Sequence, residues 1–133
     1  MIVVDSCIIF DHTRGRDARL AEWFKSFPIV ICGVVRAEVL HGVRTPNDRA
    51  KLVALLDIFP QLAMPENLWD TLGDNLAELR RNGTTVPFAD VILATLAIHH
   101  DAELWTRDAH FQKMQHHLPN LKLFQEPASD AKQ

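Results

Sequence analysis

Short apolar runs that stop abruptly constrain the fold of this chain more than any other feature of its sequence. Ile2-Val3-Val4 stops at Asp5, and Ile29-Val30-Ile31-Cys32 stops at Gly33. Apolar, β-branched runs without polar alternation are typical of strands that are buried on both faces, as in parallel sheets covered by helices. The first run therefore predicts a central strand, and we expect a helix to follow it with Ser6 as its N-cap.

Between and after these runs, apolar residues recur at helical spacing. The expected helices cover residues 20–27, 34–41, 52–59, 68–82 and 88–98. Pro28, Gly42, Pro60 and Gly83 follow the first four of them and are suitable terminators. The fifth contains almost only apolar residues, so we expect it to be buried nearly all round.

Two further strands are expected in the second half of the chain. They are Leu104-Trp105-Thr106 and residues 121–124, and Lys122 places the latter at a sheet edge. Strands that alternate with helices predict an α/β fold. We expect a single domain over residues 1–124, with a central, mostly parallel twisted sheet of four or five strands flanked by helices, and a disordered tail over residues 125–133.

Size, charge and cysteine content limit the function classes. The chain has 133 residues, enough for one core, and a formal net charge of -3, so nucleic-acid binding would require a local basic patch. Cys7 and Cys32 lie in or beside apolar runs and are expected to be free thiols, which favours a cytoplasmic location. The N-terminal apolar run is too short for a signal peptide, and no stretch approaches the roughly 20 residues of a membrane span.

Four acidic residues occupy positions that call for a specific explanation. Asp5 and Asp108 each follow an expected strand, and ligands of open α/β sheets bind beyond the carboxyl ends of the strands. Glu38 and Asp90 are isolated acids in otherwise apolar helices, where an unpaired charge costs several kcal/mol. We therefore expect all four at one edge of the sheet, facing a cation.

Taken singly, each acid is explained as well by a helix cap or by a pair with an arginine such as Arg36 or Arg107. Four together are harder to explain in this way, because clustered like charges destabilise a fold unless a metal neutralises them. Oxygen ligands without a Cys/His motif favour Mg²⁺ or Mn²⁺ over zinc, and Mg²⁺ suits phosphate chemistry. The histidine pairs at 99–100 and 116–117 are expected to be solvated, whereas His110 lies nearest the site and is a candidate substrate contact.

The four acids lie in four short blocks with a recognisable order. The blocks are Ile2-Val3-Val4-Asp5-Ser6, Ala37-Glu38-Val39-Leu40-His41-Gly42, Pro87-Phe88-Ala89-Asp90-Val91-Ile92-Leu93-Ala94-Thr95 and Leu104-Trp105-Thr106-Arg107-Asp108-Ala109-His110-Phe111. Over nearly the whole chain this order resembles PIN-domain ribonucleases, in particular the VapC-like toxins of bacterial and archaeal toxin–antitoxin pairs. Each block alone is weakly specific, but four in sequence are strongly so.

The resemblance implies a toxin endoribonuclease that hydrolyses RNA phosphodiester bonds, with transfer RNA among the candidate substrates. Asp5 and Asp90 would bind Mg²⁺ or Mn²⁺ directly, and Glu38 and Asp108 directly or through water. One or two such ions would lower the pKa of a water molecule, direct it at the phosphate and stabilise the leaving oxygen. The hydroxyl groups of Ser6 and Thr106 are candidates to orient the carboxylates or the water.

Further expectations concern partners. The resemblance implies a homodimer and a small cognate antitoxin whose tail lies near the acids. Guanidinium groups suit phosphate, although a solvated surface explains the same residues. The candidate RNA contacts are Arg14, Arg16, Arg36, Arg44 and Arg107.

The chain also departs from the family pattern at three positions. Cys7 stands where Asn or Ser is frequent, and Gly33 where Ser or Thr is frequent, which alters hydrogen bonds around the acids. His110 stands where many relatives carry a further acid, so the expected metal site ends at Asp108.

Other function classes fit the sequence less well. A haloacid-dehalogenase-like enzyme needs a second Asp at the position of Cys7, and a receiver domain needs an acidic pair after the first strand. The five glycines form neither phosphate-binding loop motif. The alternative from another class is a catalytically silent PIN module that acts as a binding partner, and the intact set of four acids argues against it.

Overall fold

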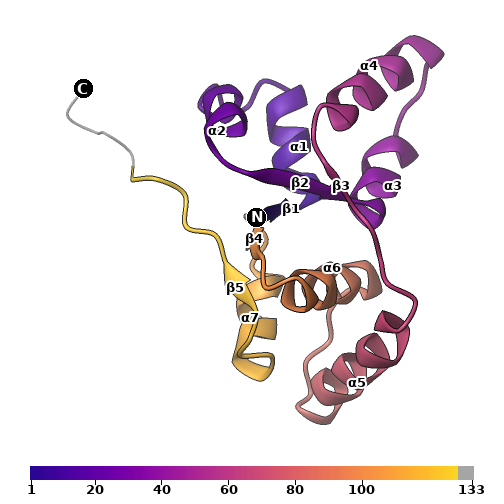
Figure 1. Cartoon of the computed structure of the whole chain (residues 1–133), viewed down its shortest axis with the longest axis vertical. Coiled ribbons are helices and arrows are strands. Elements are labelled where there is room, and N and C mark those ends of the chain that lie inside the picture. The colour runs from indigo at the N-terminus through magenta and orange to yellow at the C-terminus, as the bar shows by residue number, and fades with distance from the viewer. Residues whose placement is uncertain (129–133) are drawn as a thin grey trace.

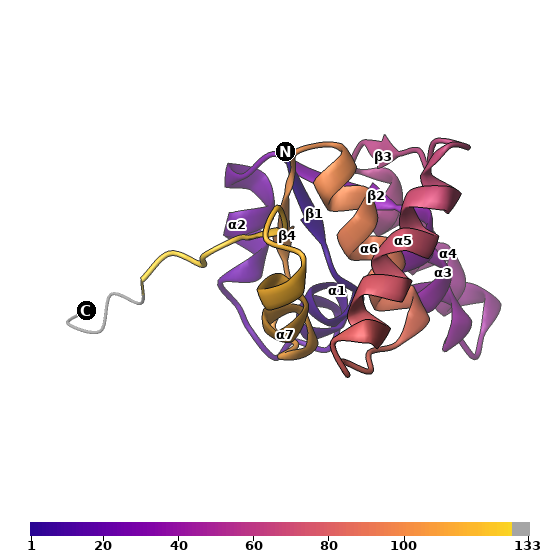
Figure 2. The same cartoon turned by 90° about the horizontal axis from the view of Figure 1, so that it is seen from below.

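The computed structural model describes residues 1–128, which form a single layer of strands covered by helices on both faces. In chain order the elements are β1 (Ile2–Val4), α1 (Ser6–Thr13), α2 (Leu20–Ser26), β2 (Ile29–Cys32), α3 (Gly33–His41), α4 (Pro46–Asp57), β3 (Gln61–Leu62), α5 (Leu68–Arg81), α6 (Phe88–His99), β4 (Glu103–Trp105), α7 (His110–His117) and β5 (Lys122–Leu123). Figures 1 and 2 show α1, α2 and α4 on one side of the sheet and α5, α6 and α7 on the other.

The sheet has five strands in the order β3-β2-β1-β4-β5, and every neighbouring pair is parallel. The chain leaves β1 toward β2 and β3 and later returns to the other side of β1 with β4 and β5. The order of strands therefore reverses between β1 and β4, and such a switch point leaves a crevice beyond the carboxyl ends of the strands. The α/β class, the parallel sheet and the central position of the first strand are confirmed.

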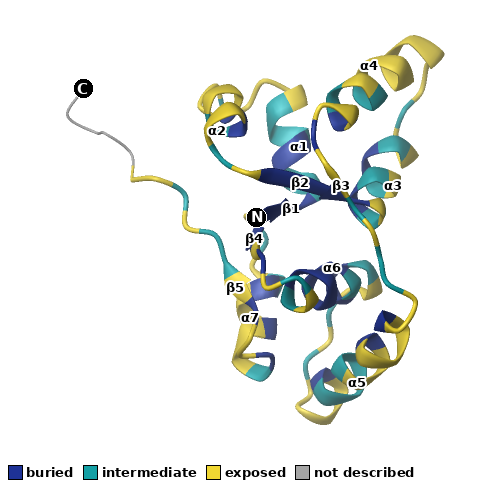
Figure 3. Cartoon of the chain, viewed as in Figure 1, coloured by how far each residue is buried: buried dark blue, intermediate teal, exposed yellow. Residues whose placement is uncertain are grey.

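Burial explains why these short strands are stable. All residues of β1 and β2 are buried, and Figure 3 shows both strands dark blue in the middle of the molecule. The helices add apolar side chains to the core from each side of the sheet. The largest fully buried side chain belongs to a strand and is Trp105 of β4. β5 is an edge strand, as Lys122 predicted.

Several local predictions need correction. The N-cap of α1 is Asp5, whose Oδ1 accepts a hydrogen bond from the Ser6 amide at 2.7 Å, so Ser6 is the first helical residue and not the cap. The sequence reading also missed β3 and α7. The helix α6 is buried over most of its length, but its first residue, Phe88, is 57% exposed.

The ends of two helices show different uses of glycine. Gly83 follows α5 with φ +70, and hydrogen bonds from the Gly83 amide to the Arg80 carbonyl and from the Thr84 amide to the Leu79 carbonyl complete a Schellman motif. Gly42 terminates α3 as predicted, but at φ -90, which any residue can adopt. The conformational freedom of glycine is therefore needed at Gly83 and not at Gly42, and it is needed again at Gly15, where φ is +66.

Three remaining expectations concern the whole chain. Cys7 and Cys32 are both free thiols. Within residues 1–128, none of the helices combines the length and the apolar character that a bilayer crossing requires. The expected disordered tail over residues 125–133 stays a prediction, because residues 129–133 lie outside the described residues. Within its described part, Glu126 contacts Arg107.

Candidate metal centre

Asp5 is held firmly at the end of β1, beside β4. Its amide donates to the Trp105 carbonyl at 2.9 Å, which continues the pairing of the two strands. Its carboxylate is 5% exposed and accepts from the Ser6 amide on Oδ1 and from the Thr106 hydroxyl on Oδ2, both at 2.7 Å. Asp5 is therefore fixed at the switch point of the sheet, with Thr106 in the orienting position that the sequence predicted.

Glu38 and Asp90 reach the same place from helices. The pKa of Glu38 is raised by burial and by the charges of Asp5 and Asp90, with a smaller opposing effect of the Ser6 side chain. The pKa of Asp90 is raised by burial and by the charges of Asp5 and Asp108, against a lowering hydrogen bond with His110. The charge of Asp5 contributes to both shifts, so the acids of α3 and α6 lie within electrostatic range of Asp5.

Asp108 and His110 complete the cluster. The Asp108 amide donates to the Thr106 hydroxyl at 3.0 Å, and Asp108 Oδ1 accepts from the His110 amide at 3.0 Å just before α7 begins. The Nδ1 atom of His110 lies 3.2 Å from Asp108 Oδ1 and 3.2 Å from Asp90 Oδ2. The structure thus brings together all four predicted acids and adds a histidine to them.

The donor atoms present suit a hard divalent cation. One ligand atom from each of Asp90, Asp108 and His110 lies within 4.8 Å of the other two, and carboxylate oxygens are the ligands that Mg²⁺ and Mn²⁺ prefer. Burial is the first cause of the raised pKa values of Glu38 and Asp90, and repulsion by the neighbouring acids adds to it. A cation bound between the acids would remove that repulsion.

Cys7 contributes a neutral group to this site. Its Sγ lies 3.5 Å from Asp5 Oδ2 and 3.8 Å from Thr106 Oγ1. Burial and the charge of Asp5 raise the pKa of the Cys7 thiol to about 12, so the thiol stays protonated at physiological pH. It is thus a weak hydrogen-bond donor to Asp5, in a place where the sequence predicted an altered hydrogen bond.

Arg107 precedes Asp108 in the chain, but its side chain pairs with three carboxylates outside the cluster of four acids. Its guanidinium contacts Asp11 at 2.9 Å, Asp17 at 2.7 Å and Glu126 at 2.7 Å. Glu126 also accepts from Trp105 Nε1 at 3.0 Å. This network connects the loop after β4 with the loop between α1 and α2 and with the C-terminal segment, and it occupies an arginine that we considered as an RNA contact.

We expect Glu126→Gln to destabilise the protein at neutral pH by about 1 kcal/mol, because it removes one charged partner of Arg107. Burial raises the pKa of Glu126, but the hydrogen bonds from Arg107 and Trp105 outweigh it, so the net shift is downward. A carboxyl group with a lowered pKa stabilises the fold above its unfolded pKa, about 4.3, and loses this effect as the pH falls through the folded value. Urea unfolding at several pH values between 7 and 3 should show the difference from the wild type shrinking.

Glu22→Gln is the matched control for this prediction. Glu22 pairs with Lys25 at 3.7 Å, and both side chains are more than three-quarters exposed, so the change should cost only a few tenths of a kcal/mol, including the weak dipole effect of an acid in the first turn of α2. A loss of stability in Glu126→Gln that is equal at pH 7 and pH 3 would contradict the role given to its charge.

The five candidate RNA contacts fall into two groups, those that form ion pairs within the protein and those that do not form them in the described part of the chain. Arg16 pairs with Asp11, Arg36 pairs with Asp57, and Arg107 pairs with three carboxylates. Arg14 and Arg44, in contrast, line a hollow of about 790 Å³ between α1, α3 and α4. Within the part of the chain that the structure describes, neither of these two arginines has an ion pair.

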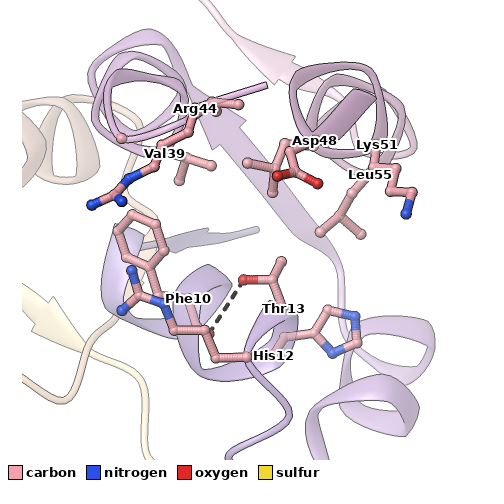
Figure 4. A pocket seen from close by; sticks show the side chains of 12 residues that line it. Phe10, His12, Thr13, Val39, Arg44, Asp48, Lys51 and Leu55 are labelled. Atoms are coloured by element: carbon pink, nitrogen blue, oxygen red, sulfur yellow. Dashed lines mark hydrogen bonds between the residues drawn. The ribbon is translucent and has the colours of Figure 1, made fainter. Parts of the chain in front are cut away.

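Figure 4 shows this hollow, with Phe10 and His12 below and Arg44, Asp48 and Lys51 above. The Arg14 guanidinium lies 4.5 Å from the centre of the Phe10 ring. A second hollow, lined by Ser6 and Glu38, shares Phe10 and Gly42 with the first, so the two adjoin. A path of concave surface therefore runs from Glu38 to the basic side chains.

Sequence reasoning missed three features of the site. It stopped the metal site at Asp108, although His110 contacts two of the acids, and the only signal was its position two residues beyond Asp108. It also left out His12 and Lys51, which join Arg14 and Arg44 around the larger hollow. Their spacing in the sequence carries no sign of this, because the hollow forms between separate helices.

Comparison with known proteins supplies a family. Residues 2–116 match the family model described as PIN domain. No curated protein sequence gives a significant match.

Solved structures of the same shape come from bacterial complexes. A chain of VapBC2 from Rickettsia felis, bound to a DNA fragment from its promoter, is 22% identical, with 93% of this chain and 98% of that chain covered and a TM-score of 0.77. VapBC-1 from nontypeable Haemophilus influenzae gives 20% identity, coverages of 93% and 97%, and a TM-score of 0.77. A toxin–antitoxin complex from Klebsiella pneumoniae gives 17% identity, coverages of 91% of this chain and 95% of that chain, and a TM-score of 0.68. At these identities the likeness concerns the fold.

Proposed function

Because this chain belongs to the PIN-domain family, we propose that it is the toxin endoribonuclease of a toxin–antitoxin pair, acting in the cytoplasm on RNA with Mg²⁺ or Mn²⁺. The observation that carries the proposal is the gathering of Asp5, Glu38, Asp90 and Asp108 at the switch point of the sheet. Asp5 and Asp108 also accept hydrogen bonds from neighbouring amides, but helix capping does not require four acids at one place, whereas a divalent cation and a phosphate do suit such a cluster.

Each acid has a role in this proposal. Asp5 and Asp90 are the most buried of the four and serve as direct ligands, with Glu38 and Asp108 binding directly or through water. Thr106 fixes the orientation of Asp5 through its hydroxyl group, and Ser6 acts on Asp5 through its amide and on Glu38 through its side chain. The bound cation would supply an activated water molecule and neutralise charge on the phosphate during hydrolysis.

The concave path beside Glu38 supports a nucleic-acid substrate. With a formal net charge of -3 the chain needs a local basic surface to bind RNA, and Arg14, Arg44 and Lys51 supply one at the hollow of Figure 4. Phe10 offers an aromatic ring at the junction of the two hollows. An RNA strand whose scissile phosphate lies at the acids can thus extend along α1 toward these cations.

The partners of the protein are part of the same proposal. A cognate antitoxin is supported by the toxin–antitoxin complexes among the solved structures of similar fold. The homodimer rests on the resemblance to VapC-like toxins alone. The gene immediately upstream of this one is the first to test as the antitoxin, and we expect a short open reading frame with a DNA-binding start there.

We expect the purified protein to cleave RNA with Mg²⁺ or Mn²⁺ and to stop when EDTA removes the metal, because the acids alone cannot activate water. The measurement is a time course on total RNA and on transfer RNA, with metal, with EDTA, and with EDTA followed by excess metal. A Glu38→Gln protein purified in the same way controls for contaminating nucleases. Cleavage that survives EDTA would overturn the metal mechanism, and a folded, metal-binding protein without cleavage would favour the silent binding module.

A further inference from the structure

Among the side chains described at this site, His110 is the one that offers a nitrogen atom. It is the first residue of α7, and its Nδ1 atom lies 3.2 Å from both Asp90 Oδ2 and Asp108 Oδ1. A ring nitrogen carries at most one hydrogen atom, so Nδ1 cannot donate a full hydrogen bond to both oxygens. In the tautomer that carries its hydrogen on Nε2, Nδ1 offers a lone pair next to two carboxylate oxygens.

The spacing of these atoms matches the ligand shell of an octahedral cation. With metal–ligand bonds of 2.0–2.1 Å, adjacent ligands of an octahedral ion lie about 3 Å apart. Both contacts of His110 Nδ1, at 3.2 Å, are close to this value, and the three atoms stay within 4.8 Å of one another. They can therefore occupy three corners of one octahedron after small adjustments.

We propose that His110 is a nitrogen ligand of the metal centre and that it makes this centre select Mn²⁺ over Mg²⁺. The inference rests on the proposed function only in taking the acids to bind a divalent cation. Imidazole is a good ligand for first-row transition ions, whereas Mg²⁺ strongly prefers oxygen and keeps its water. A relative with a further acid in place of His110 would offer an all-oxygen shell instead.

The surroundings of the ring allow this role. The side chain of His110 is 39% exposed, so a ring that binds a metal through Nδ1 would still be partly in contact with water. A metal-bound histidine usually donates its other ring N–H to water or to an oxygen of the protein. Asp90 is much less exposed, at 12%, so the cation would lie between a buried acid of α6 and a half-exposed imidazole of α7.

The test measures metal binding without RNA. Calorimetric titration of the metal-free full-length protein should give an affinity for Mn²⁺ at least about tenfold higher than for Mg²⁺. His110→Asn should weaken Mn²⁺ binding by about tenfold or more and Mg²⁺ binding much less. His110→Asp should restore an all-oxygen shell and lower the ratio of Mn²⁺ to Mg²⁺ affinity.

Electron spin-echo spectroscopy of the Mn²⁺-loaded protein gives a direct readout. The wild type should show coupling of the manganese to a nitrogen nucleus, and His110→Asn should lose it. His116→Asn is the matched control, because His116 lies near the other end of α7 beside Lys113 and His117; it should keep both the coupling and the metal affinities.

Two results would overturn the inference. One is a wild-type spectrum without nitrogen coupling, and the other is an equal loss of Mn²⁺ and Mg²⁺ affinity in His110→Asn, which would indicate a positioning role for the ring. Failure of the proposed function is distinguishable from both, since a protein that binds Mn²⁺ through His110 without cleaving RNA would contradict only the nuclease proposal.

Discussion

Asp5→Asn should abolish RNA cleavage and the growth arrest that follows expression of the protein, while the fold stays intact. Asn is as good an N-cap as Asp, and its side-chain oxygen can still accept the 2.7 Å hydrogen bond from the Ser6 amide. The charge that would hold the cation is lost, however. Since changing groups around metal ligands already costs 10- to 100-fold, loss of a direct ligand should reduce cleavage by at least about a hundredfold.

The measurements are single-turnover cleavage of RNA, growth after induction, and thermal unfolding of the purified variant. Asp74→Asn is the control, because Asp74 is exposed on α5 and far from the acids in the sequence; it should remain toxic. Co-expression of the antitoxin should relieve the arrest by the wild type. Equal toxicity of the wild type and a stably folded Asp5→Asn protein would remove Asp5 from the centre.

The central part of the fold could be predicted because its signals are strong and local. The run from Ile2 to Val4 has no polar residue, so it had to be a buried strand, and its end at Asp5 gave the position of the site. The edges could not be predicted in this way. β3 has only the two residues Gln61 and Leu62, too few to show a period, and it is defined by its pairing with Ile31 and Cys32 of β2.

The helix α7 was missed for a related reason. Most of its eight residues are polar, and only Phe111 and Met114 are buried. Two apolar residues three apart do not distinguish a helix from a turn in the sequence alone. The helix matters for the site, because its first residue is His110.

The acids of the site could be predicted as a set, whereas their neighbours could not. Asp90 was recognisable as an acid in an apolar helix, but its contact with His110 depends on how α6 and α7 pack. The same holds for Arg107, which is a plausible phosphate ligand in the sequence and an internal ion-pair partner in the structure. The partners of a charged side chain depend on how distant segments pack together, and the local sequence pattern does not show this packing.

Asp90→Asn should raise the melting temperature of the metal-free protein and abolish its cleavage of RNA. In the fold, burial and the charges of Asp5 and Asp108 raise the pKa of Asp90, against a partial lowering by His110. A carboxyl group with a raised pKa weakens the fold once the pH exceeds its unfolded value, about 3.9, and this cost is complete above the folded pKa. Asn removes the cost at pH 7, so the difference between the two proteins should shrink as the pH falls toward 4.

Asp70→Asn is the matched control, because Asp70 is also the third residue of its helix but is exposed. It loses only a favourable interaction with the helix dipole, about 0.3–1 kcal/mol, and should melt slightly lower than the wild type. The melting curves are recorded for all three proteins with EDTA and with a series of Mg²⁺ and Mn²⁺ concentrations.

The metal response separates a ligand from a structural acid. A cation at a hundredfold excess over its Kd stabilises the wild type by roughly 2.7 kcal/mol, and Asp70→Asn should respond equally. Asp90→Asn should respond much less, so that metal reverses the order of stability between it and the wild type. If Asp90 were a helix cap or only the partner of His110, its loss would lower the melting temperature as the loss of Asp70 does, and metal would shift all three proteins alike. A destabilised Asp90→Asn protein with a full metal response would therefore exclude Asp90 from the centre, even if it no longer cleaved RNA.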